Sequence, residues 1–445
     1  MKNSKIRAEK IESRIVELAQ CSDEPDCLSR VFGTKAFVEA QHKIESWMKE
    51  AGLQTYIDNI GNVRGKLFSE VQDAKTFVIA SHFDTVINAG KYDGAFGILS
   101  GLDIVENIVQ QNIKLPFHIE VIAFSDEEGV RFHASYLGSK VVAGNFNVEM
   151  LQKKDHDGIS LEQALQGLHY DSSKFSDNAI KPEDWLGYYE IHIEQGPVLY
   201  NSNIAAGIVT AIAGQRRMSI EFTGIAGHAG TVPMKMRTDA LCAAAEFILA
   251  VEQFAIAKKS GVVATVGKIE IQHGASNVIP GKATCSLDLR SGSKKKLTRA
   301  YESLNEICED ICNKRKIYFE WKLIHETNPV TCDEALTKLL KKSIKQKDME
   351  IIEMESGAGH DAVAISEVAP VSMLFVKCFK GISHNPLEKT EIKDIATALE
   401  ISDNFIGQLS SKVSDLLQAQ IDNQPQISKQ DEIEKEPHVG KIGEA

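Results

Sequence analysis

The sequence places a histidine and two aspartates directly after an apolar segment. Residues 76–80 (Thr-Phe-Val-Ile-Ala) have the composition of a buried strand, and His82, Asp84 and Asp93 follow it. Since alternate side chains of a strand share a face, Asp84 can accept the imidazole N–H that a metal-bound His82 leaves free. Asp93, on the next loop, is placed where a second carboxylate could bridge two ions. A histidine at a strand end is more often a hydrogen-bonded surface residue, so this pattern needs support from elsewhere in the chain.

Two adjacent glutamates form a second pattern. Glu127 and Glu128 follow an apolar strand expected at 117–124. Adjacent side chains face different ways, so one carboxylate can ligate a metal while the other holds water. A glutamate beside a metal-activated water is the usual general base in metal-assisted hydrolysis. A lone Glu-Glu pair is more often two solvated surface acids, but here a hydrophobic strand directs both to the ligand-binding edge of a sheet.

Two further histidines complete a possible set of ligands. His192 and His384 lie in or after strand-like sequence, and turn-forming residues follow each of them. Either one alone would be interpreted as a structural histidine. Together with His82, Asp93 and Glu128 they supply three imidazoles and two carboxylates. Such a set is sufficient for two ions that share one bridging carboxylate.

The elements expected to position these residues predict an α/β fold with a mixed central sheet flanked by helices. In residues 1–211, strands alternate with helices and polar groups collect at strand ends. In residues 212–329, a βαββαβ order predicts a smaller inserted α+β domain with an antiparallel sheet and two helices. The first pattern returns in 330–411. Residues 412–445 are expected to form a disordered acidic tail.

Composition limits the classes of function. The chain has 445 residues, 43% of them hydrophobic, and a formal net charge of -12. This length predicts two domains, and the negative charge argues against binding to nucleic acids or anionic membranes. We expect a cytoplasmic protein, because no secretory signal or long apolar segment is visible. The eight scattered cysteines are expected to be reduced thiols.

The order of the motifs resembles one enzyme family. The chain resembles the dinuclear-metal amidohydrolases of the M20 peptidase superfamily, in the branch of allantoate amidohydrolases, N-carbamoyl-L-amino-acid hydrolases and β-ureidopropionases. The resemblance runs from about residue 5 to about residue 410. It rests on residues 81–85 (Ser-His-Phe-Asp-Thr), 90–94 (Gly-Lys-Tyr-Asp-Gly), 126–132 (Asp-Glu-Glu-Gly-Val-Arg-Phe), 192–197 (His-Ile-Glu-Gln-Gly-Pro), 227–234 (Gly-His-Ala-Gly-Thr-Val-Pro-Met), 277–281 (Asn-Val-Ile-Pro-Gly) and 356–362 (Ser-Gly-Ala-Gly-His-Asp-Ala).

This resemblance implies a zinc-aminopeptidase-like catalytic domain, an inserted dimerisation or lid domain, and a homodimer. It also implies two divalent ions per subunit, either Zn²⁺ or Mn²⁺, between which the spacing of the ligands does not choose. The roles that it assigns are His82 and His192 on one ion, Glu128 and His384 on the other, Asp93 as the bridge, and Glu127 as the general base.

The resemblance also assigns residues that bind the substrate. His228 would polarise the scissile carbonyl and stabilise the oxyanion, often in the active site of a neighbouring subunit. The simpler interpretation is a turn histidine between glycines. Arg290 would bind the substrate carboxylate, a role suited to a guanidinium group, although an arginine at a strand end is usually solvated. The other expected substrate contacts are Gln195, Arg217, Asn277 and the backbone of Gly359.

The implied reaction is hydrolysis of a ureido C–N bond in a small anionic substrate. We favour allantoate, converted to ureidoglycine, ammonia and carbon dioxide, because residues 86–94 and 115–121 resemble bacterial allantoate amidohydrolases. The alternatives are an N-carbamoyl-L-amino-acid hydrolase or a β-ureidopropionase, then a peptidase of the same family. A non-catalytic scaffold is the alternative from another class, but scaffolds typically lose ligands or the base, and all six positions are filled here.

Overall fold

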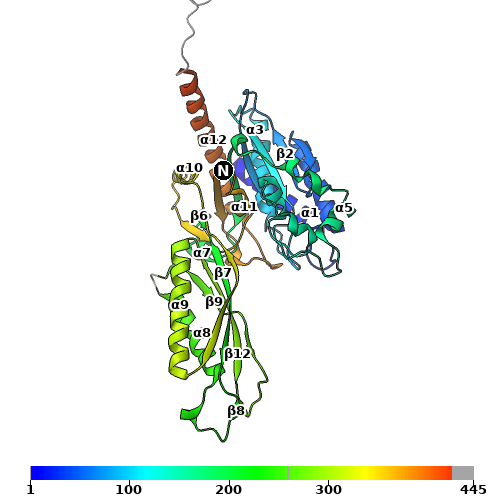
Figure 1. Cartoon of the computed structure of the whole chain (residues 1–445). Helices are drawn as coiled ribbons and strands as arrows, with labels where there is room; N and C mark the ends of the chain where they lie inside the picture. Colours follow the sequence, from blue (N-terminus) through cyan, green and yellow to red (C-terminus); the bar gives the residue numbers. More distant parts are fainter. Residues whose placement is uncertain (1, 258–259, 423–445) are drawn as a thin grey trace, which may run out of the picture.

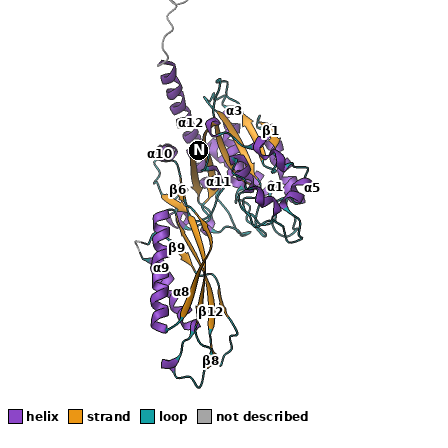
Figure 2. Cartoon of the chain, in the orientation of Figure 1, coloured by secondary structure: helices purple, strands orange, loops and turns teal. Residues whose placement is uncertain are grey.

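The computed structural model describes residues 2–257 and 260–422, which form a larger α/β body and a smaller elongated body (Figures 1 and 2). The colours of Figure 1 show that the larger body combines early segments in blue and cyan with late segments in orange. The smaller body comes from the green and yellow segments between them. The chain therefore leaves the main sheet, builds the second body, and returns.

The larger body contains a nine-stranded mixed sheet. Its order is β1-β2-β4-β3-β5-β16-β6-β14, and β15 pairs with β6. The neighbours β4, β3, β5 and β16 run parallel, whereas β2 is antiparallel to β4, and β6 is antiparallel to β16 and β14 but parallel to β15. The strands are β1 (Gln54–Ile57), β2 (Val63–Leu67), β3 (Thr76–His82), β4 (His118–Phe124), β5 (Trp185–Ile193), β6 (Ala206–Ile212), β14 (Val330–Thr331), β15 (Glu353–Ser356) and β16 (Val371–Val376).

Helices cover both faces of this sheet, which explains the nearly uninterrupted apolar sequence of its central strands. Phe77 and Ile79 of β3 pack in one core with α1, α2, α3 and α12, and Val78 and Ala80 pack in a second core with α4 and α11. The helices are α1 (Lys2–Leu18), α2 (Lys35–Glu50), α3 (Ala95–Gln110), α4 (Leu137–Ala143), α5 (Leu161–Gly167), α6 (Phe175–Asn178), α7 (Val198–Ser202), α10 (Glu334–Lys345), α11 (Ala362–Ile365) and α12 (Ile392–Asp422). Short 3₁₀ helices are η1 (Val148–Gln152), η2 (Ser172–Lys174), η3 (Pro182–Asp184) and η5 (Phe379–Gly381).

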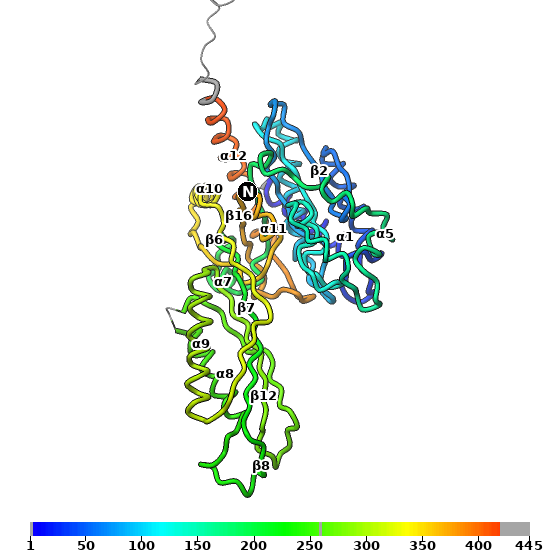
Figure 3. The backbone as a smooth tube through the Cα atoms, in the orientation of Figure 1, coloured from blue at the N-terminus to red at the C-terminus, as the bar shows by residue number. Residues whose placement is uncertain are grey.

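The smaller body contains a five-stranded antiparallel sheet of order β10-β12-β7-β13, with β9 also paired to β12. Alternate residues of β12 are buried, so one face of the sheet packs on the helices α8 and α9. A two-stranded ribbon, β8 with β11, lies at the far end of this body (Figure 3). The elements are β7 (Gly214–Thr223), β8 (Gly227–His228), η4 (Met234–Met236), α8 (Ala240–Ile256), β9 (Val263–Thr265), β10 (Ile269–Ile271), β11 (Val278–Ile279), β12 (Lys282–Ser291), α9 (Lys294–Arg315) and β13 (Tyr318–Thr327).

Two local predictions were wrong. The sequence over 151–168 predicts a helical region, but the side chain of Asp155 accepts the backbone N–H groups of Asp157 and Ile159, and the resulting turn separates η1 from α5. We also expected disorder from residue 412, but α12 continues to Asp422. Residues 423–445 of the predicted tail lie outside the described residues.

None of the helices in the described ranges combines the length and the apolar character needed to cross a bilayer. The eight cysteines all lie within these ranges, and none of them forms a disulfide.

Candidate active site

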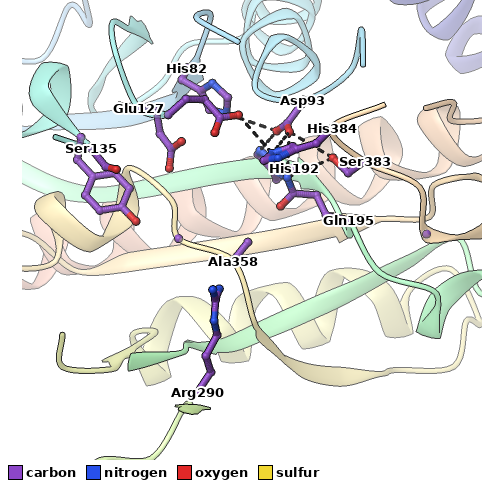
Figure 4. A pocket seen from close by; sticks show the side chains of 14 residues that line it. His82, Asp93, Glu127, Ser135, His192, Gln195, Arg290, Ala358, Ser383 and His384 are labelled. Carbon is purple, nitrogen blue, oxygen red and sulfur yellow. Dashed lines mark hydrogen bonds and ion pairs between the residues drawn. The ribbon is translucent and has the colours of Figure 1, made fainter. Parts of the chain in front are cut away.

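A cavity of about 450 Å³ lies at the carboxyl ends of the parallel strands β3, β4 and β5 and beside the loop after β16. Open α/β sheets place ligand sites at this edge because all the parallel strands end there. Figure 4 shows its lining from close by. The lining residues are His82, Asp93, Glu127, Glu128, Ser135, Tyr136, His192, Gln195, Arg290, Ala358, Gly359, Gly381, Ser383 and His384.

Asp93 lies at the centre of the five predicted metal ligands, and all five line this cavity. Its Oδ1 is 3.5 Å from His82 Nε2 and 3.2 Å from His192 Nε2. Its Oδ2 is 3.1 Å from His384 Nε2, and that nitrogen is 3.3 Å from Glu128 Oε1. The two oxygens of one carboxylate therefore face two different groups, which is the arrangement that a bridging ligand needs.

The hydrogen-bond geometry of the two buried histidines is compatible with a metal ion. His82 Nδ1 lies 3.1 Å from the carbonyl oxygen of Asp84, and His192 Nδ1 lies 2.9 Å from that of Ile193. A proton on Nδ1 satisfies each carbonyl and leaves the lone pair of Nε2 facing Asp93. His192 Nε2 is buried and has no hydrogen-bond partner within the described residues. A cation between the lone pair and the carboxylate would satisfy both.

The surrounding charges favour an ionised bridging carboxylate. Burial disfavours the charged form of Asp93, but the rings of His192, His384 and His82 lower its pKa well below the ordinary value. Asp93 belongs to two groups of possible ligands, one with His82 and His192 and one with Glu128 and His384. Within each group the ligand atoms lie within 4.8 Å of one another. Imidazole nitrogens with carboxylate oxygens suit zinc and manganese.

Asp84 orients the glutamates through its carboxylate, and this differs from its predicted contact. We expected the carboxylate to accept the N–H of His82, but Asp84 Oδ1 is 3.6 Å from His82 Nδ1, beyond hydrogen-bond distance, and the main-chain carbonyl of Asp84 takes that place. The backbone N–H groups of Glu127 and Glu128 donate to Oδ1 and Oδ2 of Asp84 at 3.0 and 3.1 Å. Asp84 therefore fixes the turn that carries both glutamates.

Glu127 lies beside the ligands and faces the cavity. One of its carboxylate oxygens lies within 4.8 Å of ligand atoms of His82 and Glu128. Within the described residues, this carboxylate accepts no hydrogen bond. Burial raises the pKa of Glu127 well above its ordinary value; the nearby His82 ring opposes this shift and the charge of Glu128 adds to it. A carboxylate with a raised affinity for protons is suited to proton transfer.

Gln195 lines the cavity, and its side-chain amide also contacts the carboxylate of Asp93. Its Nε2 donates to Asp93 Oδ2 at 2.9 Å and to Ser383 Oγ at 3.3 Å. The residue has a φ of 57°, in the left-handed region, just where β5 turns away from the sheet. We had expected Gln195 to bind substrate, and in this structure its amide holds Asp93.

Sequence reasoning missed Glu388, which supports Asp93 from behind. Glu388 Oε1 accepts the backbone N–H groups of Tyr92 and Asp93 at 2.7 and 3.0 Å, and Oε2 accepts the hydroxyl of Ser383 at 2.8 Å. A Cβ at Gly90 would lie 2.2 Å from Glu388 Cδ, so only glycine leaves space for this carboxylate. Burial and the charge of Asp93 raise the pKa of Glu388 to about 7. Glu388 is an acidic residue in a polar loop, and no sequence pattern around it predicted this contact.

Replacing Glu388 by alanine is expected to weaken metal binding by roughly 10- to 100-fold, as removal of groups that orient ligands typically does. The change removes the acceptor that fixes the loop of Asp93. Metal titration of the apo protein measures the effect. Glu391→Ala, at an exposed position paired with Lys393, is the matched control. An unchanged affinity in Glu388→Ala would contradict the role assigned to this carboxylate.

The second body contributes Arg290 to the cavity, where it contacts the backbone segment that carries Gly359. Figure 4 shows Arg290 reaching toward Ala358 from the side opposite the histidines. Arg290 donates to Gly357 O at 2.7 Å and to Asp288 Oδ1 at 3.0 Å. Arg217 does not line this cavity. It lines a neighbouring cavity of about 540 Å³ that Arg290 also borders.

His228 and Asn277 are not brought to this cavity of their own chain. His228 lies in β8, Asn277 precedes β11, and the Asn277 carbonyl accepts the N–H of Ala229 at 2.9 Å. Both side chains are exposed, in the ribbon at the far end of the smaller body.

Comparison with known proteins connects this site to a family. The model described as "Peptidase family M20/M25/M40" matches residues 78–408. The chain belongs to this family. The match spans the strand before His82, the whole smaller body and the loop of His384, so every residue of the cavity described above lies within the M20 region.

Relatives and solved structures cover most of the chain. An allantoate deiminase of Arabidopsis thaliana is 38% identical over 87% of this chain and 79% of its own length. An N-carbamoyl-L-amino-acid amidohydrolase of a Pseudomonas species is 36% identical over 90% of this chain and 98% of its own. The crystal structure of a hydantoinase/carbamoylase-family amidase from Burkholderia multivorans has a TM-score of 0.84 at 30% identity, and covers 91% of this chain and 98% of that one. These M20 neighbours share the mixed α/β architecture found here.

Proposed function

We propose that this M20 protein hydrolyses the ureido C–N bond of a small anionic ureido acid, with allantoate as the favoured substrate. The observation that carries the proposal is the bridging position of Asp93 between two groups of ligands, with Glu127 free beside them. Similarity to an allantoate deiminase and an N-carbamoyl-L-amino-acid amidohydrolase supports the class of substrate.

Different residues would bind the metal ions and transfer the proton. His82 and His192 would hold one divalent ion, Glu128 and His384 a second, with Asp93 shared; these ions would supply positive charge that polarises the carbamoyl oxygen and acidifies water. Glu127 takes a proton from the water that attacks the carbamoyl carbon. It then delivers that proton to the nitrogen of the bond that breaks.

Binding of the substrate is assigned to the opposite wall. Arg290 presents a guanidinium group to the cavity, suited to the carboxylate of a ureido acid, and the backbone beside Gly359 lies next to it. Arg217 lines the neighbouring cavity that Arg290 also borders, and it adds positive charge there.

An ammonia-release assay with purified protein tests the proposal. The panel is allantoate, N-carbamoyl-L-amino acids, N-carbamoyl-β-alanine and a dipeptide, each with zinc or manganese. Turnover of allantoate above the others supports the favoured substrate, and preference for an N-carbamoyl-L-amino acid would reassign the chain within the same chemistry. Absence of turnover of every ureido compound would reject the function.

We also propose that the protein is a homodimer in which His228 and Asn277 complete the cavity of the partner. Both residues are exposed at the far end of the smaller body, away from their own cavity. Large apolar side chains are also exposed on this body, among them Ile225, Met234, Leu249 and Ile256.

Hybrid dimers test the shared site. Co-expression of Glu127→Gln and His228→Ala chains is expected to give about a quarter of the wild-type activity in the whole mixture and about half in the isolated hybrids, although each variant alone is nearly inactive. Half of the dimers are hybrids, and each hybrid carries one intact site of two. Two affinity tags isolate the hybrids, and sedimentation measures their mass. Hybrids no more active than the single variants would place His228 in its own chain's chemistry or outside it.

A further inference from the structure

We propose that Tyr136 is a substrate-positioning residue, whose phenol donates a hydrogen bond to an oxygen of the ureido acid outside the scissile carbamoyl group. The inference rests on the proposed function and adds a determinant of binding to it. Neither the motifs nor the expected substrate contacts had singled out Tyr136.

The phenol lies beside the segment 357–359, in which the Gly357 carbonyl accepts a hydrogen bond from Arg290. Tyr136 lines the cavity, and a Cβ built on Gly359 would lie only 1.7 Å from the Tyr136 hydroxyl oxygen. The hydroxyl therefore occupies the space that any other residue at 359 would fill. Figure 4 places Ala358, the neighbour of Gly359, between the histidine cluster and Arg290. A group at this position reaches the part of a ligand that extends away from the reacting carbonyl.

The hydroxyl has no hydrogen-bond partner within the described residues, although the side chain is largely enclosed. Its ring is held by Lys140, whose Nζ lies 5.6 Å from the ring centroid and donates to Ser135 O at 3.0 Å. Burial raises the pKa of Tyr136 above its ordinary value, and the charges of Glu127 and Asp361 add to this. The O–H is therefore a protonated donor that faces the cavity.

The backbone of Tyr136 is also unusual. Its φ of 65° and ψ of 30° lie in the left-handed region, which is rare for an aromatic residue and costs free energy. The N–H of Tyr136 donates to Glu127 O at 3.2 Å, and its carbonyl accepts from Lys140 N at 3.0 Å. The turn that carries Glu127 thus also fixes the aromatic side chain in the cavity, so the base and the phenol share one rigid support.

Arg290 and Tyr136 offer different donors to one ligand. The guanidinium group supplies a charged donor. The phenol supplies a neutral donor, which favours substrates that carry an oxygen at the matching position. A buried donor left without its acceptor costs binding free energy, so a substrate lacking an oxygen at this place would bind more weakly.

Steady-state kinetics of Tyr136→Phe tests the proposal, because this change removes only the hydroxyl. For the best substrate of the wild-type protein, KM is expected to rise about tenfold, as loss of one hydrogen bond predicts, while kcat stays within about twofold. The thermal midpoint is expected to be unchanged. Tyr56→Phe, at a partly exposed tyrosine of the edge strand β1, is the matched control and is expected to change neither constant.

The outcomes separate the two proposals. A wild-type protein that turns over a ureido acid, together with a Phe variant of unchanged KM, would overturn the role of Tyr136 alone. A fall in kcat without a change in KM would also overturn it, because the phenol would then act at the reacting atoms. A wild-type protein that turns over no ureido acid would overturn the proposed function, and the assignment of Tyr136 with it.

Discussion

Replacing Glu127 by glutamine is expected to lower kcat by roughly 10²- to 10⁴-fold, the usual contribution of a general acid–base, while metal content stays at the wild-type level. Glutamine has the shape of glutamate but cannot accept a proton from water. The carboxylate is not at the centre of the ligand cluster, and its backbone N–H still donates to Asp84. Ammonia release and elemental analysis of the same preparation measure the two quantities.

Glu24→Gln is the matched control, because Glu24 is exposed and lies outside the cavity. It is expected to leave kcat and metal content unchanged. Two results would contradict the assignment of Glu127: a variant that keeps most of its turnover, or one that loses its metal. In the second case Glu127 would be a ligand, and the proton would have to move through another group.

Replacing Asp93 by asparagine is expected to remove both the activity and the tight binding of metal. An amide offers one oxygen and one NH₂ group, so it cannot bridge two ions as a carboxylate does. The rings of His82, His192 and His384 would then face a neutral group. Thermal unfolding with added metal measures the loss: an ion at 100 times its Kd stabilises the wild-type fold by about 2.7 kcal/mol.

The Asp93→Asn variant is expected to show little of this stabilisation. Asp177→Asn, at an exposed position of α6, is its control and should respond to metal as the wild type does. Full metal-dependent stabilisation of Asp93→Asn would show that Asp93 is not shared between ions, and the proposed two-ion arrangement would fail.

The sequence could bring the five candidate ligands together because each one lies at the end of a strand of strongly apolar sequence or in a loop that follows one. β3, β4, β5 and β16 run parallel, so residues after them meet at one edge even when they are far apart in the chain. Strand alternation did not predict the partner of His82, because β3 ends at His82 and Asp84 already lies in the following loop.

The supporting contacts were not predictable, because they depend on how loops fold over one another. Glu388 reaches the backbone of Asp93 from a segment almost three hundred residues away in the chain, and no local pattern marks it. Tyr136 enters the cavity only because its backbone adopts a left-handed conformation. Similarly, the apolar pattern weakens after Leu409, but a helix already anchored by buried residues can extend into solvent, as α12 does.

The insertion of the smaller body has a consequence for biosynthesis. Four of the five candidate ligands precede this body in the chain, and His384 follows it. During translation, His82, Asp93, Glu128 and His192 are therefore synthesised before β16 and the loop that carries His384. A polypeptide truncated in the inserted body lacks both His384 and β16, the strand that pairs with β5, so it cannot assemble the full set of candidate ligands.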